Sequence, residues 1–119
     1  MKKLLFSVLS LMLALVAWAQ GPQVKVDGGM IEGIDSAGVK IFRGIPFAAP
    51  PVGNLRWKAP QPVVAWQGVR SANAFGNDPI QYNAFGDMVF EGPKQSEACL
   101  YLNVWTPTQN YGEKLPVLI

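Results

Sequence analysis

The sequence predicts a β-rich segment of short strands that forms part of a larger folded body. Hydrophobic residues make up 50% of the 119 residues and charged residues only 15%, which is typical of a buried chain and not of a disordered one. Short stretches of alternating apolar residues are separated by glycine-rich turns, as in a series of short strands. Residues 115–119 are apolar at four of five positions, as in a central strand covered on both faces.

The segment 1–19 has the features of an export signal. Lys2 and Lys3 precede an apolar run, and residues 17–19 have the small-x-small pattern that a signal peptidase accepts, which predicts cleavage between Ala19 and Gln20. A transmembrane anchor is the alternative, but the run of about 13 residues is shorter than the roughly 20 that a bilayer core requires. We therefore expect a signal peptide (1–19) and a periplasmic or secreted part (20–119), with only transient membrane contact.

Charge and composition exclude several classes of function. Without the two signal lysines, eight Lys and Arg residues balance eight Asp and Glu residues, whereas a nucleic-acid-binding surface needs excess positive charge. No histidine is present, so no His base or His metal ligand can come from this chain. The single Cys99 cannot form an internal disulfide, and is interpreted either as a buried small side chain or as half of a bond to a partner.

The segment after the signal predicts a small antiparallel meander. Residues 24–34 contain two apolar-alternating stretches around an Asp-Gly-Gly turn, and residues 39–42 form a third stretch after a second turn. Ser36 lies in that second turn. A nucleophile elbow needs glycine two positions before and two after its serine, but Ile34 occupies the first of these positions. Ser36 is therefore interpreted as a turn residue.

Five prolines between positions 46 and 62 predict an extended, irregular strap over residues 45–62, because such density excludes a helix and most ladder positions. The strap is expected to be ordered, since apolar side chains in and beside it favour burial; these are Phe42, Phe47, Leu55 and Trp57. Residues 66–69 predict a short strand or turn. Residues 74–96 lack periodicity and predict a long loop of the kind that is usually functional or covered by a partner.

Residues 100–105 are the strongest predicted strand, which Pro107 ends. A turn around 110–112 leads to a second apolar strand at 115–119. A chain that ended within such a strand would leave ladder groups unpaired. We therefore expect the sequence to be the N-terminal piece of a larger protein.

Three stretches of the sequence are similar to motifs of one known protein family. Residues 42–57 read FRGIPFAAPPVGNLRW, similar to the family segment F-x-G-I-P-[FY]-A-x-P-P-x-G-x-x-R-[FW]. Residues 96–107 read SEACLYLNVWTP, similar to the family signature S-E-D-C-L-x-L-N. Residues 115–119 match the strand that in the family runs into the H-G-G-G oxyanion loop. Two long motifs in this order, with agreement from about residue 24 to 119, make the resemblance specific: the chain resembles the type B carboxylesterases, a family that includes cholinesterases and lipases.

The resemblance implies the α/β class and the α/β-hydrolase fold. This chain would supply the small N-terminal antiparallel sheet, the proline-rich strap and the first strands of the main sheet. It also implies a hydrolase that cleaves small-molecule carboxylic esters with a serine, a histidine and an acidic residue, without cofactor or metal; the expected signal peptide predicts that this hydrolase is exported. None of these residues matches a position here, so we expect no catalytic, cofactor-binding or metal-binding residue in the chain, which stops before the oxyanion loop and should be inactive alone.

Two charged residues match a pair that the family buries as a salt bridge. Arg56 and Glu97 would tie the strap to the main sheet, and breaking such a buried pair typically costs about 3–5 kcal/mol. We therefore expect Arg56→Ala to lower the melting temperature clearly. The alternative is that Arg56 and Glu97 are two unrelated surface charges.

The chain also departs from the family pattern. Pro79 stands where relatives usually have a cysteine bonded to the one matching Cys99, so the loop from about residue 79 to 96 is expected to be less constrained. Ala98 replaces a usual aspartate. In the family this loop lies over the active-site gorge, so its apolar side chains either line a substrate entrance or pack the loop down; these are Tyr82, Phe85, Met88 and Phe90.

Two other functions stay open. The first is a non-catalytic binding protein, because some relatives are adhesion proteins that keep the fold without the catalytic triad. The second is a small, complete, secreted β-rich binding module. The unfinished strand at 115–119 and the lack of disulfides argue against such a module, because small exported domains usually need cross-links.

Overall fold

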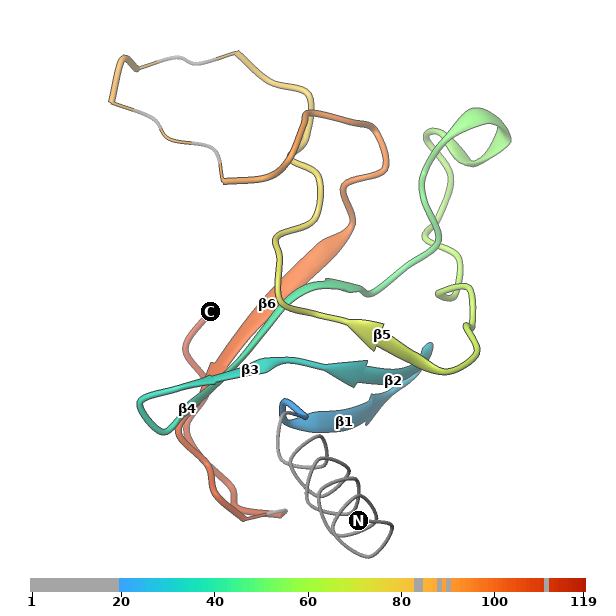
Figure 1. Ribbon diagram of the computed structural model, residues 1–119. Helices are drawn as coiled ribbons and strands as arrows, with labels where there is room; N and C mark the ends of the chain where they lie inside the picture. Colours follow the sequence, from blue (N-terminus) through green and yellow to red (C-terminus); the bar gives the residue numbers. More distant parts are fainter. Residues whose placement is uncertain (1–19, 83–84, 88, 90, 111) are drawn as a thin grey trace, which may run out of the picture.

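The protein consists of six short strands and one 3₁₀ turn in the residues that its structure, a computed structural model, describes: 20–82, 85–87, 89, 91–110 and 112–119. The expected signal peptide and the side chains of Met88 and Phe90 lie outside these residues. The elements are β1 (Gln23–Val26), β2 (Gly29–Glu32), β3 (Ile34–Ser36), β4 (Val39–Pro46), η1 (Gly53–Leu55), β5 (Val69–Ser71) and β6 (Tyr101–Thr106) (Figure 1).

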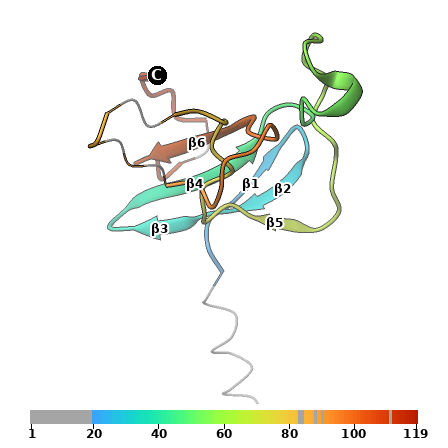
Figure 2. The same cartoon turned by 90° about the horizontal axis from the view of Figure 1, so that it is seen from above.

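The strands form two three-stranded sheets, and the middle strands are β2 in one and β4 in the other. The strand order is β1-β2-β5 in the first sheet and β3-β4-β6 in the second (Figure 2). Only β5 runs parallel to its neighbour, β2. The other pairs, β1–β2, β3–β4 and β4–β6, are antiparallel.

The β1–β2 hairpin confirms the two strands expected around the Asp-Gly-Gly turn, and Trp66 packs over that turn. The indole Nε1 donates a hydrogen bond to the Met30 carbonyl at 2.8 Å, and the Trp66 backbone N–H donates to the Gly28 carbonyl at 2.9 Å. A Cβ atom at Gly28 would lie 2.0 Å from the Trp66 ring. Position 28 therefore requires glycine because the indole occupies the space of a side chain.

The expected three-stranded meander is wrong, because the predicted strand at 30–34 is divided at Gly33. Residues before Gly33 belong to β2 of the first sheet, and Ile34 begins β3 of the second. A Cβ atom at position 33 would lie 2.3 Å from the Ile41 carbonyl oxygen and 2.7 Å from the Phe42 ring. The chain thus passes from one sheet to the other at a position where the neighbouring strand leaves no room for a side chain.

The hydrophobic core lies where the two sheets meet. Its buried members are Ile31, Phe42, Ile45 and Ala72. Ala72 also joins the sheets through its backbone: its N–H donates to the Glu32 carbonyl at 2.7 Å, and its carbonyl accepts from the Arg43 N–H at 2.7 Å. The residue after β5 therefore connects the end of β2 to the middle of β4.

A β-bulge interrupts the pairing of β4 with β6 between Phe42 and Ile45. Gly44 lies in this bulge with a φ of +65°, a conformation that glycine adopts without steric cost. Its N–H donates to the Asn103 side-chain oxygen at 2.9 Å, and a Cβ atom there would lie 2.7 Å from the Ala74 carbonyl oxygen. The bulge is thus hydrogen-bonded to β6 through Asn103, and the loop after β5 lies against its other side.

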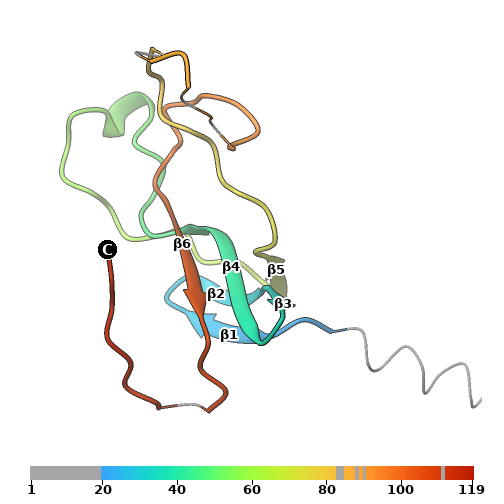
Figure 3. The same cartoon turned by 90° about the vertical axis from the view of Figure 1, so that its left-hand side faces the viewer.

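Two long excursions leave the sheets in the same general direction (Figures 1 and 3): the strap between β4 and β5, drawn in green, and the long loop between β5 and β6. From residue 47 on the strap is irregular as expected, apart from η1, whereas residues 45 and 46, which were expected to begin it, end β4 and pair with β6. Burial of all its apolar side chains is not observed. Phe47 is 53% exposed and Trp57 is 97% exposed, because no described residue covers them. Trp57 also has a φ of +60°, which is uncommon for a residue other than glycine.

The segment after β6 does not form the second strand that the sequence predicts. β6 itself agrees closely with the predicted strand at 100–105, but residues 115–119 form no strand. They turn back toward the sheets (Figure 3) without pairing to β6, so their apolar side chains stay exposed; Leu118 is 100% exposed. A strand needs a neighbour to satisfy its backbone groups, and residues 115–119 make no ladder with β6, which pairs only with β4 among the described strands. No helix among the described residues is long and apolar enough to cross a membrane.

Replacing Gly33 by alanine should destabilise the protein by about 2–3 kcal/mol, because the new methyl group overlaps the Ile41 carbonyl and the Phe42 ring at the junction of the sheets. The melting temperature measured by circular dichroism is expected to fall by roughly 10 °C. Gly86→Ala is the matched control, since nothing lies within 4 Å of a Cβ atom there. Equal melting temperatures for the two variants would contradict the steric account.

Candidate functional site

The strap is tied to the segment before β6 by one ion pair. The Arg56 guanidinium Nη2 lies 2.9 Å from Glu97 Oε1. Arg56 follows η1 directly, where its backbone N–H donates to the Gly53 carbonyl, and Glu97 lies shortly before β6. The pair thus brings together the two family-like motifs of the sequence, at residues 42–57 and 96–107.

The pairing of Arg56 with Glu97 is confirmed, but its expected burial is wrong for the described chain. The two side chains are 53% and 39% exposed. Water therefore screens the attraction, and an exposed pair of this kind typically contributes about 0–1 kcal/mol instead of the roughly 3–5 kcal/mol expected for a buried one. The strap carries no second layer of described residues that would exclude water from the pair.

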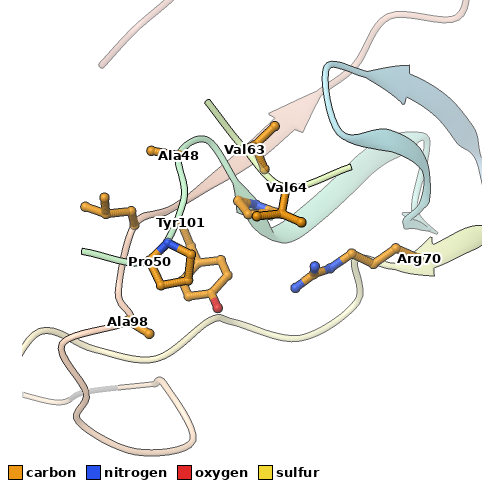
Figure 4. A pocket seen from close by; sticks show the side chains of 9 residues that line it. Ala48, Pro50, Val63, Val64, Arg70, Ala98 and Tyr101 are labelled. Carbon is orange, nitrogen blue, oxygen red and sulfur yellow. The ribbon is translucent and has the colours of Figure 1, made fainter. Parts of the chain in front are cut away.

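A cavity of about 190 Å³ lies between the strap and the beginning of β6 (Figure 4). Most of its lining is apolar. Arg70 and Tyr101 are the lining residues that carry a polar group, the guanidinium and the hydroxyl. The Arg70 guanidinium also lies over the Trp66 ring, 5.3 Å from its centroid, in cation–π geometry. The lining residues are Pro46, Ala48, Pro50, Val63, Val64, Arg70, Ala98, Leu100 and Tyr101.

The cavity can receive an apolar group of a few carbon atoms, with a positive charge near one wall. Its lining contains neither a nucleophile beside a base nor a set of carboxylates. Elsewhere in the described part of the chain, no three His, Cys, Asp or Glu side chains come close enough together to hold a metal ion. The arrangement therefore offers contacts for packing or binding, and no described group for covalent chemistry.

Two aromatic rings lie beside Arg43 on β4, in a cluster that the sequence did not predict. Its guanidinium lies 4.8 Å from the Phe75 ring centroid and 6.0 Å from that of Trp105, and the two rings are 6.3 Å apart. Arg43 Nε is buried and has no hydrogen-bond partner among the described atoms. The aromatic faces stabilise the positive charge. The three residues are far apart in the sequence. The pairing of β4 with β6 brings Arg43 and Trp105 together, and Phe75 follows Ala72, whose carbonyl accepts the Arg43 N–H.

The other residues singled out in the sequence are not gathered into one site. Ser36 is exposed and is the last residue of β3, so it precedes the turn at residues 37–38 and does not lie in it as expected. Cys99 is free and only partly buried, so its expected burial is incomplete. Tyr82 and Phe85 are 94% and 69% exposed. They do not pack the loop down in the described structure, and whether they line a substrate entrance stays a prediction.

Comparison with known proteins decides the family. A model described as the carboxylesterase family matches residues 20–119. The chain belongs to the carboxylesterase family. It is 46% identical over 94 residues to the fumonisin B1 esterase of Sphingopyxis macrogoltabida, covering 76% of this chain and 16% of that protein. It is 38% identical over 112 residues to human carboxylesterase 5A, covering 87% of this chain and 18% of the relative. The family inferred from the motifs is confirmed.

Solved esterase structures have the same fold over the shared part. A PNB esterase superposes on 71% of this chain with a TM-score of 0.66 and 41% sequence identity. The Geobacillus stearothermophilus carboxylesterase superposes on 74% of the chain with a TM-score of 0.62 and 36% identity. The α/β-hydrolase fold is thus confirmed, and this carboxylesterase chain forms a sheet-rich N-terminal part of it. The chain spans less than a fifth of the length of each of these relatives.

A double-mutant cycle on Arg56→Ala and Glu97→Ala should give a coupling free energy below about 1 kcal/mol, because both side chains are well exposed to water. The coupling is measured from the urea unfolding of the two single variants, the double variant and the parent. It is expected to decrease further at about 1 M salt, where exposed charges are screened. A coupling of about 3 kcal/mol that salt leaves unchanged would instead be the behaviour of a buried pair and would contradict the exposed geometry.

Proposed function

We propose that the protein containing this carboxylesterase-family chain is an exported serine hydrolase that cleaves small-molecule carboxylic esters. The observation that carries the proposal is the family match over residues 20–119, joined by the superposition on a PNB esterase at 41% identity. Several relatives are named as esterases or carboxylesterases. Both motif-bearing segments, the strap and the segment before β6, lie within the matched region.

In this proposal the chain contributes scaffold and no catalytic group. It contains no histidine, and none of its serines has glycine at both positions that a nucleophile elbow requires. The serine, the histidine and its acidic partner, and the oxyanion-binding amides would then lie outside residues 1–119. The role of the described part is to position the strap and β6 against those groups through the junction of the two sheets.

Ester hydrolysis is tested on the protein translated from the whole reading frame that includes residue 119. With p-nitrophenyl butyrate it should release p-nitrophenol and be inactivated by a serine-directed phosphonate, whereas residues 20–119 alone should show no activity above the uncatalysed rate. Labelling without turnover would indicate that another substrate class is needed. Neither labelling nor turnover would instead support a non-catalytic relative and overturn the proposal.

Export is tested through the apolar run of the N-terminus. In a Gram-negative host the protein should appear in the periplasm or medium with Gln20 at its N-terminus, because residues 17–19 suit the signal peptidase. Leu9→Arg, which places a charge in the middle of the run, should retain most of the protein in the cytoplasm with the segment 1–19 still attached. Peptide mass spectrometry identifies the N-terminus, and an uncleaved protein in the periplasm would contradict the predicted cleavage.

A further inference from the structure

The cavity between the strap and β6 has walls from separate segments of the chain that are hydrogen-bonded to one another. The segment after β4 is joined to the returning limb of the strap by a bond from the Ala49 N–H to the Gln61 carbonyl at 3.0 Å. It is joined to the residue before β6 by a bond from the Phe47 N–H to the Leu100 carbonyl at 3.3 Å. Backbone hydrogen bonds on two sides therefore fix the shape of the cavity.

The lining of this cavity changes from buried and apolar to exposed and charged. Ala48 is 5% exposed, and Leu100 and Tyr101 are partly buried. Val64 is 69% exposed, and Arg70 is also exposed. The apolar surface thus lies inside the cavity, and the charged side chain lies where the cavity opens to water.

Arg70 carries the only charge of the described lining. Its guanidinium lies over the Trp66 ring, and the hydrogen bond from Trp66 Nε1 to the Met30 carbonyl fixes that ring. The Arg70 side chain extends from β5 toward the Tyr101 ring (Figure 4). Among the described residues Arg70 makes no ion pair, and the lining contributes no carboxylate. The cavity therefore holds one oriented positive charge and no negative charge that would neutralise it.

We propose that this cavity is a binding site for a short-chain monocarboxylate, whose apolar tail fills the cavity and whose carboxylate binds the Arg70 guanidinium. A guanidinium pairs with a carboxylate through two parallel hydrogen bonds, and the Tyr101 hydroxyl is a further donor. An apolar cavity of roughly 150 Å³ accepts benzene. The cavity of about 190 Å³ here therefore accommodates a tail of about six carbon atoms. An amine of the same length would instead place its ammonium beside the guanidinium, where like charges repel.

The site is expected in an esterase and in a non-catalytic relative alike, because it requires only the cavity and its charge. In an esterase, the carboxylic acid that hydrolysis sets free belongs to the same chemical class, so the cavity would also bind the product. Binding of a carboxylate needs no turnover, and its measurement therefore fails or succeeds independently of the test of ester hydrolysis.

Hexanoate is the probe, and saturation-transfer NMR measures its binding to the protein translated from the whole reading frame that includes residue 119. The protein is first treated with the serine-directed phosphonate, so that a catalytic serine is blocked where one is present. Hexanoate should bind about tenfold more tightly than hexan-1-ol, which has the same tail without the charge, and hexylammonium should not bind. Absence of hexanoate binding would overturn the site. Hexan-1-ol that binds as tightly as hexanoate would overturn the assignment of a carboxylate ligand.

Arg70→Gln should weaken hexanoate binding about tenfold, because it removes the charge and the paired donors of the guanidinium. Lys58→Gln is the matched control. It also removes one positive charge, from an exposed strap residue outside the lining, and should leave hexanoate binding unchanged. An equal loss in the two variants would indicate attraction by net charge alone and would overturn the site.

Val64→Glu is the second variant, because it places a negative charge on an exposed side chain of the lining without disturbing the core. It should weaken the binding of hexanoate more than that of hexan-1-ol, since only hexanoate carries a like charge. Hexanoate binding that is unchanged in both Arg70→Gln and Val64→Glu would overturn the proposal.

Discussion

Ala72 connects the two sheets of this carboxylesterase chain with both of its backbone groups. Its N–H bonds the end of β2 and its carbonyl bonds the middle of β4, each at 2.7 Å, and its side chain lies in the core with Ile31, Phe42 and Ile45. Short strands have few ladder bonds of their own. The arrangement of the sheets therefore depends on this junction and on Gly33, where the chain crosses between them.

The strap and the long loop are the parts that this junction positions. The strap leaves the end of β4 and returns at β5, and the loop leaves β5 beyond Ala72 and returns at β6. Each excursion is then held by polar contacts, the strap by Arg56 with Glu97 and the loop by Asp78 with Gln95. The sheets are joined in the buried core, and polar contacts hold the strap and the long loop. This arrangement suits a scaffold that presents segments to the rest of an α/β-hydrolase domain.

Local pattern in the sequence was sufficient for β1, β2, β4, β6 and the family. It was insufficient for the division of the sheets, for residues 115–119 and for the contacts between distant segments. The turn glycines and the apolar alternation predict β1, β2 and β4, and the motifs predict the Arg56–Glu97 pair. The division at Gly33 could not be predicted, because it depends on Ile41 and Phe42 of another strand. The cluster of Arg43 with two aromatic rings and the exposure of the ion pair depend in the same way on tertiary packing.

Amide hydrogen exchange at Arg43 and Ala72 is the most direct test of the junction. Both N–H groups donate 2.7 Å hydrogen bonds that join the sheets, so their exchange should be among the slowest in the described chain and should occur only on global unfolding. The exchange is measured residue by residue by NMR, with the amides of the exposed residues 117–119 as the fast reference. Exchange at Arg43 and Ala72 as fast as at residues 117–119 would contradict the account.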